Sequence, residues 1–111
     1  MTALKERIEH CYELSGRLAL NDQKYTLVHG ILTSPLTEQQ LAHAWVEFES
    51  KDGIGMLVFD PVMDITLPQQ GYYNLFKVTH RTVYLNSEAI ENMTQPGHFG
   101  PWQKEKENGH G

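Results

Sequence analysis

The chain has 111 residues, of which 40% are hydrophobic and 21% are charged, and its formal net charge at pH 7 is -5. This length and composition predict one small globular domain with a single modest core. The acidic balance, without consecutive basic residues, argues against nucleic acid or an anionic membrane as a partner.

The sequence also argues against a membrane span. No apolar run approaches the roughly 20 residues that cross a bilayer. The first ten residues, MTALKERIEH, carry charges where a signal peptide has an apolar stretch. We therefore expect a cytoplasmic protein; the sequence does not indicate its oligomeric state.

The predicted elements begin with a helix over residues 3–20. Apolar residues recur there at spacings of three and four, which is typical of a helix with one buried face. The residues of this stripe are Leu4, Ile8, Cys11, Leu14 and Leu18. Cys11 therefore faces inward, either as a packed core residue or as a thiol directed into a cleft.

Four strands are predicted after this helix, because their segments are rich in β-branched and aromatic residues or alternate in polarity. The segments are 24–32, 41–50, 56–60 and 77–85. The second and third flank the glycine-containing turn KDGIG, which predicts an antiparallel hairpin. Pro61 ends the third strand directly after Asp60.

Two short helices complete the predicted elements, at residues 67–76 and 87–93. The order of one helix followed by a mostly antiparallel sheet predicts an α+β fold. We expect a single domain over residues 1–102. The polar residues 103–111 are expected to form a disordered tail. His98 and Trp102 lie in the aromatic loop GHFGPW, which could cover one side of the sheet.

Cys11 is the only cysteine, so it can form neither an internal disulfide nor a Cys-rich zinc site. Such a residue is ordinarily a small buried hydrophobe. The alternative is a nucleophile, which needs a base and a group that orients the base. His43 in the second strand and Asp60 at the end of the third can meet across the hairpin, and the packed helix can bring the thiol to them.

These residues carry a resemblance to a known family. The chain has Cys11 on a helix, then His43-Ala44-Trp45-Val46-Glu47 in a strand, then Asp60-Pro61 at the end of the next strand. This order resembles the transglutaminase-like cysteine enzymes of the papain-like superfamily, over residues 11–61. Animal transglutaminases are larger and have tryptophan after the cysteine, where this chain has Tyr12. The size looks more like small bacterial or phage-encoded members, which include peptidases that remove leader segments from lasso-type peptides.

The resemblance implies a transglutaminase-like core and a role for each residue. Cys11 would be the nucleophile, His43 the general base and then acid, and Asp60 the group that orients His43. The substrate would be a peptide or protein amide, reacting through a thioester as in a peptidase, deamidase or transglutaminase. No cofactor or metal is expected, because sulfur and imidazole carry the chemistry. The alternative is a small binding or inhibitor protein on the same fold without turnover, for example a phage-encoded one.

Other residues are weaker candidates. Gln23, just after the first helix, could donate its amide to an oxyanion hole. Trp45 shares the strand face of His43 and could wall a substrate cleft or fill the core. Glu47 could be a second acid, but its place near the turn favours a solvated side chain. His29 could join His43 and Asp60 in a metal site, which no metal-binding motif supports. The adjacent Tyr72 and Tyr73 are interpreted as ordinary core.

Overall fold

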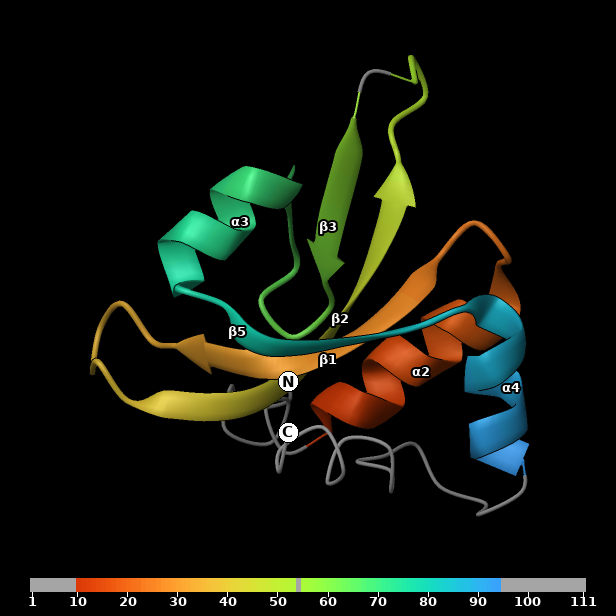
Figure 1. Cartoon of the computed structure of the whole chain (residues 1–111), viewed down its shortest axis with the longest axis horizontal. Coiled ribbons are helices and arrows are strands. Elements are labelled where there is room, and N and C mark those ends of the chain that lie inside the picture. The colour runs from red at the N-terminus through yellow and green to blue at the C-terminus, as the bar shows by residue number, and fades with distance from the viewer. Residues whose placement is uncertain (1–9, 54, 95–111) are drawn as a thin grey trace.

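The computed structural model describes residues 10–53 and 55–94 of the chain. These residues form three helices and five strands (Figure 1). In chain order the elements are α2 (Cys11–Asn21), β1 (Thr26–Thr33), β2 (Gln40–Glu49), β3 (Met56–Asp60), β4 (Ile65–Pro68), α3 (Gln69–Phe76), β5 (Thr79–Tyr84) and α4 (Asn86–Thr94). The strands form one antiparallel sheet in the order β4-β3-β2-β1-β5, which confirms the predicted α+β class.

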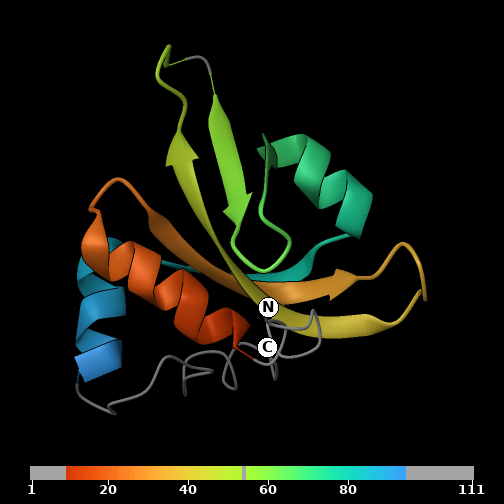
Figure 2. The same ribbon diagram turned by 180° about the vertical axis from the view of Figure 1, so that it is seen from behind.

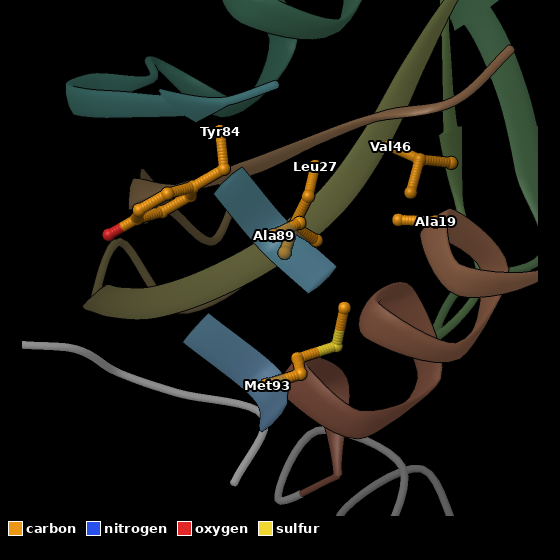
Figure 3. Close-up of a cluster of buried hydrophobic side chains, with 6 residues drawn as sticks. All are labelled: Ala19, Leu27, Val46, Tyr84, Ala89 and Met93. Carbon is orange, nitrogen blue, oxygen red and sulfur yellow. The ribbon is translucent and has the colours of Figure 1, made fainter. Parts of the chain in front are cut away.

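Helices cover both faces of the sheet. α2 and α4 lie on one side and α3 lies on the other (Figures 1 and 2). Alternate side chains of β2 lie on opposite faces of the sheet, because successive side chains of a strand point in opposite directions. Val46 packs with Ala19 and Ala89 under α2 and α4 (Figure 3), whereas Trp45 packs with Tyr72 of α3.

The predicted hairpin between residues 41 and 60 is confirmed. β2 and β3 pair in antiparallel fashion, from Val46 opposite Phe59 to Glu49 opposite Met56. Gly53 in the connecting turn has a φ of 72°, a conformation that glycine adopts without steric cost. The pairing brings Asp60, the last residue of β3, toward the middle of β2.

The prediction of four strands missed one. Residues Ile65–Pro68 form β4, which pairs with β3 at one edge of the sheet. This strand has only four residues and ends in a proline, so it lacks the length and composition of a strand signal. The helix expected at 67–76 consequently begins at Gln69, after Pro68. The last predicted strand is β5, which pairs with β1.

Two further predicted helices are present, with shifted ends. α2 extends over Cys11–Asn21, and α4 over Asn86–Thr94. The start of the first predicted helix, the GHFGPW loop and the polar tail lie outside the described residues. No helix in the described ranges is long and apolar enough to cross a membrane.

Gly30 of β1 makes room for the large side chain on the neighbouring strand. A Cβ atom at Gly30 would lie 2.9 Å from Cη2 of Trp45, closer than packed carbon atoms approach. The missing side chain therefore allows the indole to approach the backbone of β1 closely. This packing holds Trp45 beside His43 on the same face of β2.

Candidate active site

Three elements bring Cys11, His43 and Asp60 together. Cys11 is the first residue of α2, His43 lies in β2, and Asp60 is the last residue of β3. Backbone pairing between β2 and β3 stops near Asp60, so the part of β2 around His43 has an open edge there. The start of α2 lies against this part of β2, where Cys11 packs with Ala44 and with Val62.

The imidazole of His43 connects the other two side chains. Its Nε2 lies 2.8 Å from Oδ2 of Asp60, in a buried ion pair. Cys11 also interacts with this ring, because its side chain is among the groups that raise the pKa of His43. Because Nε2 is engaged by Asp60, Nδ1 is the ring nitrogen left for the thiol. The arrangement is that of a nucleophile, a base and an orienting carboxylate in series.

The surroundings of His43 favour its protonated form. Burial alone would lower the pKa of His43, but the hydrogen bonds and negative charges of Asp60 and Cys11 outweigh burial and raise this pKa to about 9. The ring is therefore an imidazolium at neutral pH. A cationic ring beside a sulfur atom can pair with a thiolate, which is the reactive form of cysteine.

Asp60 has a complete set of hydrogen-bond donors. Its Oδ1 accepts from the backbone N–H groups of Val62, at 2.9 Å, and Met63, at 3.2 Å. Its Oδ2 accepts from the Tyr72 hydroxyl at 2.6 Å in addition to His43. Burial would raise the pKa of Asp60, but the hydrogen bond and charge of His43 and the other donors hold it below its usual value. Asp60 is therefore a fixed anion that orients the imidazole.

Tyr72 is a site residue that the sequence prediction missed. It was interpreted as core, and its ring is indeed fully buried. Its hydroxyl, however, reaches from α3 to Asp60. Burial and the negative charge of Asp60 raise the pKa of Tyr72, so the hydroxyl stays neutral and donates. A buried tyrosine ordinarily needs a hydroxyl partner, but only the folded chain shows that Asp60 is this partner.

The expectation that Glu47 is solvated is wrong. Glu47 is only 4% exposed, because strand alternation places it beside Trp45 on the face covered by α3. Its carboxylate accepts from Nε1 of Trp45 at 3.0 Å and from Nε2 of Gln69 at 2.8 Å. The Tyr73 hydroxyl is a third donor. Glu47 thus joins β2 to α3 and fixes the Trp45 indole.

Tyr73 extends this network toward the surface, which corrects its interpretation as ordinary core. Nη1 of Arg81 donates to the Tyr73 hydroxyl at 2.8 Å. Burial, followed by the hydrogen bond and charge of Glu47, raises the pKa of Tyr73 to about 12. Adjacent tyrosines of α3 therefore bind two carboxylates of the sheet: Tyr72 binds Asp60, and Tyr73 binds Glu47. The helix is fixed over the strands that carry His43.

The structure does not bring Gln23 to the site. Gln23 is exposed and follows the C-terminal end of α2, whereas Cys11 begins this helix of 11 residues. A helix of that length spans about 15 Å. Trp45 is fully buried, and its ring centroid lies 6.2 Å from that of His43. Trp45 therefore supports the imidazole from within the core.

His29 lies on the opposite face of the sheet from His43 and Asp60. It pairs with Ala44 in β1–β2 register, so its side chain shares the face of Ala44, opposite to that of His43. Its ring packs edge-on against Tyr12 and Tyr84, at centroid distances of 4.7 and 5.0 Å. The proposed set of His29, His43 and Asp60 therefore does not assemble. Over the described ranges, no three His, Cys, Asp or Glu side chains are grouped as metal ligands.

Comparisons with known proteins do not indicate a function. No protein-family model matches the chain, and no curated protein or solved structure is significantly similar to it. The function of the protein is therefore inferred from the arrangement of Cys11, His43 and Asp60.

Proposed function

We propose that the protein is a cysteine-dependent amide hydrolase or acyltransferase with the triad Cys11, His43 and Asp60. The observation that carries this proposal is the buried chain of contacts from the thiol through the imidazole to the carboxylate. An ordinary core cysteine does not require a cationic histidine beside it. Three separate elements supply the three groups, and their order along the chain is the pattern that carries the resemblance to transglutaminase-like enzymes.

In the first step, the Cys11 sulfur attacks the carbonyl carbon of the amide and forms a C–S bond. The sulfur reacts as a thiolate, and the His43 imidazolium donates a proton to the departing nitrogen as the C–N bond breaks. An amine leaves, and the acyl group remains on sulfur as a thioester. Asp60 keeps the ring oriented and stabilises its positive charge throughout.

The second step regenerates the enzyme. Water, or an amine in the acyl-transfer case, attacks the thioester carbonyl while neutral His43 accepts its proton. The C–S bond breaks and the sulfur leaves as a thiolate beside the imidazolium. A carboxylic acid or a new amide is released, so no electrons are exchanged and no cofactor is needed.

The start of α2 offers donors for the oxyanion that develops on the substrate. The first intrahelical hydrogen bond runs from Leu14 N to the carbonyl oxygen of His10. The Cys11 N–H precedes this bond, so it does not take part in the hydrogen bonds of α2. The Cys11 N–H is the donor nearest to a carbonyl bonded to Sγ, and we assign it this role in place of Gln23.

Alkylation kinetics test the proposal. Cys11 is 1% exposed, and a core thiol at this depth reacts with iodoacetamide more slowly than free cysteine. A catalytic Cys11 should instead react faster than free cysteine near pH 6, where a free thiol is almost entirely protonated. The Cys11→Ala variant supplies the unreactive baseline, since Cys11 is the only cysteine. A rate below that of free cysteine would favour a binding protein without turnover.

The proposal also includes a compartment. A catalytic thiol must remain reduced, and the cytoplasm maintains reduced thiols. We therefore propose a cytoplasmic enzyme that acts on a peptide or protein amide.

A further inference from the structure

A cavity of about 270 Å³ opens beside the candidate triad. Its walls come from the connection between β1 and β2, the turn after β3, and the last residue of α3, Phe76. Figures 1 and 2 show this end of α3 next to the β1–β2 hairpin. His43 itself lines the cavity. We call this cavity the apolar pocket.

The apolar pocket also adjoins Cys11. Val62 and Met63 line it, and both pack in the cluster that contains Cys11. The same two residues donate their backbone N–H groups to Asp60. One short turn therefore forms a wall of the pocket and holds the carboxylate of the triad. A molecule bound in the pocket would therefore contact His43 and the turn that packs on Cys11.

The chemistry of the pocket selects an apolar ligand. Among the described residues that line it, only Ser34 and His43 have polar side chains. The Ser34 hydroxyl accepts from the backbone N–H groups of Leu36 and Thr37 within its own loop. The ring of His43 is engaged by Asp60 and Cys11. The Ser34 O–H is then the one side-chain donor left for a ligand among these described residues, so most polar atoms of a buried amide or carboxylate would lack a partner, which is unfavourable.

The loop that forms one wall of the pocket is held by its own hydrogen bonds. Backbone hydrogen bonds close the hairpin loop, from Ser34 N to Gln39 O at 2.9 Å and from Glu38 N to Ser34 O at 2.8 Å. An engineered cavity of about 150 Å³ is sufficient to bind benzene. A cavity of 270 Å³ therefore accommodates a leucine or phenylalanine side chain.

We propose that the apolar pocket binds a bulky apolar side chain of the substrate, carried by the acyl part that remains bonded to Cys11. This inference rests on the proposed function and narrows it. In glutamine deamidation or crosslinking, the acyl group bonded to sulfur is the glutamine side chain. This side chain is unbranched and narrow, so it would leave the pocket unfilled. The pocket instead favours a peptide-bond substrate with leucine or phenylalanine close to the reacting carbonyl.

Peptidyl chloromethyl ketones test the pocket on the whole chain. The sulfur displaces chloride from the probe, so a C–S bond replaces the C–Cl bond and the mass of the protein reports the reaction. The probes are acetylated dipeptides with Leu-Ala, Ala-Leu or Ala-Ala sequences. At least one leucine probe should react about tenfold or more faster than Ala-Ala, since each added methylene in an apolar pocket favours binding and reaction.

Two variants locate the preference. Leu36 lines the pocket but is 93% exposed, so Leu36→Asp places a charge at the mouth with little risk to folding. The rate of each probe is first divided by the iodoacetamide rate of the same variant. The leucine preference, which is the ratio of the leucine-probe rate to the Ala-Ala rate, should then fall at least about threefold in Leu36→Asp. Leu85→Asp is the matched control: Leu85 is 61% exposed and lies outside the pocket lining, so the preference should not change.

The outcomes separate the two proposals. Rapid iodoacetamide alkylation without a leucine preference would overturn the apolar pocket and leave the proposed function standing. The pocket assignment also fails if Leu36→Asp and Leu85→Asp change the preference equally. Slow reaction of Cys11 with iodoacetamide and with every probe would overturn the proposed function, and the pocket assignment with it.

Discussion

Replacing Tyr72 with phenylalanine tests whether α3 holds the carboxylate of the candidate triad. The Tyr72 ring is fully buried, and its hydroxyl donates to Oδ2 of Asp60 at 2.6 Å. Tyr72→Phe keeps the ring and removes this donor alone. Asp60 then retains three of its four donors, namely His43 and the N–H groups of Val62 and Met63.

The size of the effect follows from the charge on the acceptor. A hydrogen bond to an ionised group contributes about 1.5–3 kcal/mol. We therefore expect Tyr72→Phe to lower the free energy of unfolding by about 2 kcal/mol near neutral pH, measured by urea denaturation. Tyr25→Phe is the control, because Tyr25 packs against Phe48 and lies outside the Asp60 contacts. That control should change stability by less than about 0.5 kcal/mol.

The effect should also depend on pH in one direction. The pKa of Asp60 is lowered in the folded protein from an ordinary value of 3.8. Donors to the ionised carboxylate therefore stabilise the folded state above that ordinary value, and their contribution disappears as pH falls through the lowered pKa. The difference in free energy of unfolding between wild type and Tyr72→Phe should therefore become smaller in acid. If this difference is absent at neutral pH, or becomes larger in acid, Tyr72 does not stabilise the ionised Asp60 carboxylate.

Three further predictions concern the neighbouring side chains. His43 should give the ¹⁵N chemical shifts of an imidazolium at neutral pH and titrate near 9; neutral-ring shifts at pH 7 would contradict the pairing with Asp60 and Cys11. Cys11→Ala should abolish amide turnover but leave the protein folded by circular dichroism. Asp60→Asn should retain weak activity, since the nucleophile and the base remain. Its free energy of unfolding should fall by about 3–5 kcal/mol, because the variant breaks a buried ion pair. Glu47→Gln should lower stability by about 2 kcal/mol through mismatched donors, yet alter Cys11 alkylation less than twofold; a large kinetic effect would place Glu47 in the chemistry.

The parts of the site that depend on local pattern could be predicted from the sequence. Alternation on both sides of KDGIG specified the β2–β3 hairpin, and the end of β3 at Pro61 placed Asp60 beside β2. The helical stripe directed Cys11 inward. These predictions required only the periodicity of a helix or strand and the chemistry of one turn.

The parts that depend on packing between distant segments could not be predicted. The distances from Tyr72 to Asp60 and from Gln69 to Glu47 are set by where α3 lies on the sheet. Sequence position near a turn suggested that Glu47 is solvated, but α3 covers that face of β2 and buries it. β4 was not predicted because its four residues carry no strand pattern of their own. Only its pairing with β3 in the folded chain identifies it as a strand.

The pH profile of Cys11 alkylation in wild type, His43→Ala and His80→Ala tests the central claim most directly. His80 is exposed and lies outside the site contacts, so His80→Ala controls for loss of a histidine. If the His43 imidazolium pairs with the sulfur, the wild-type and His80→Ala rates should persist below pH 7, whereas the His43→Ala rate should fall with decreasing pH like that of an ordinary thiol. If the wild-type and His43→Ala profiles coincide, His43 does not activate Cys11, and the proposed cysteine chemistry is wrong.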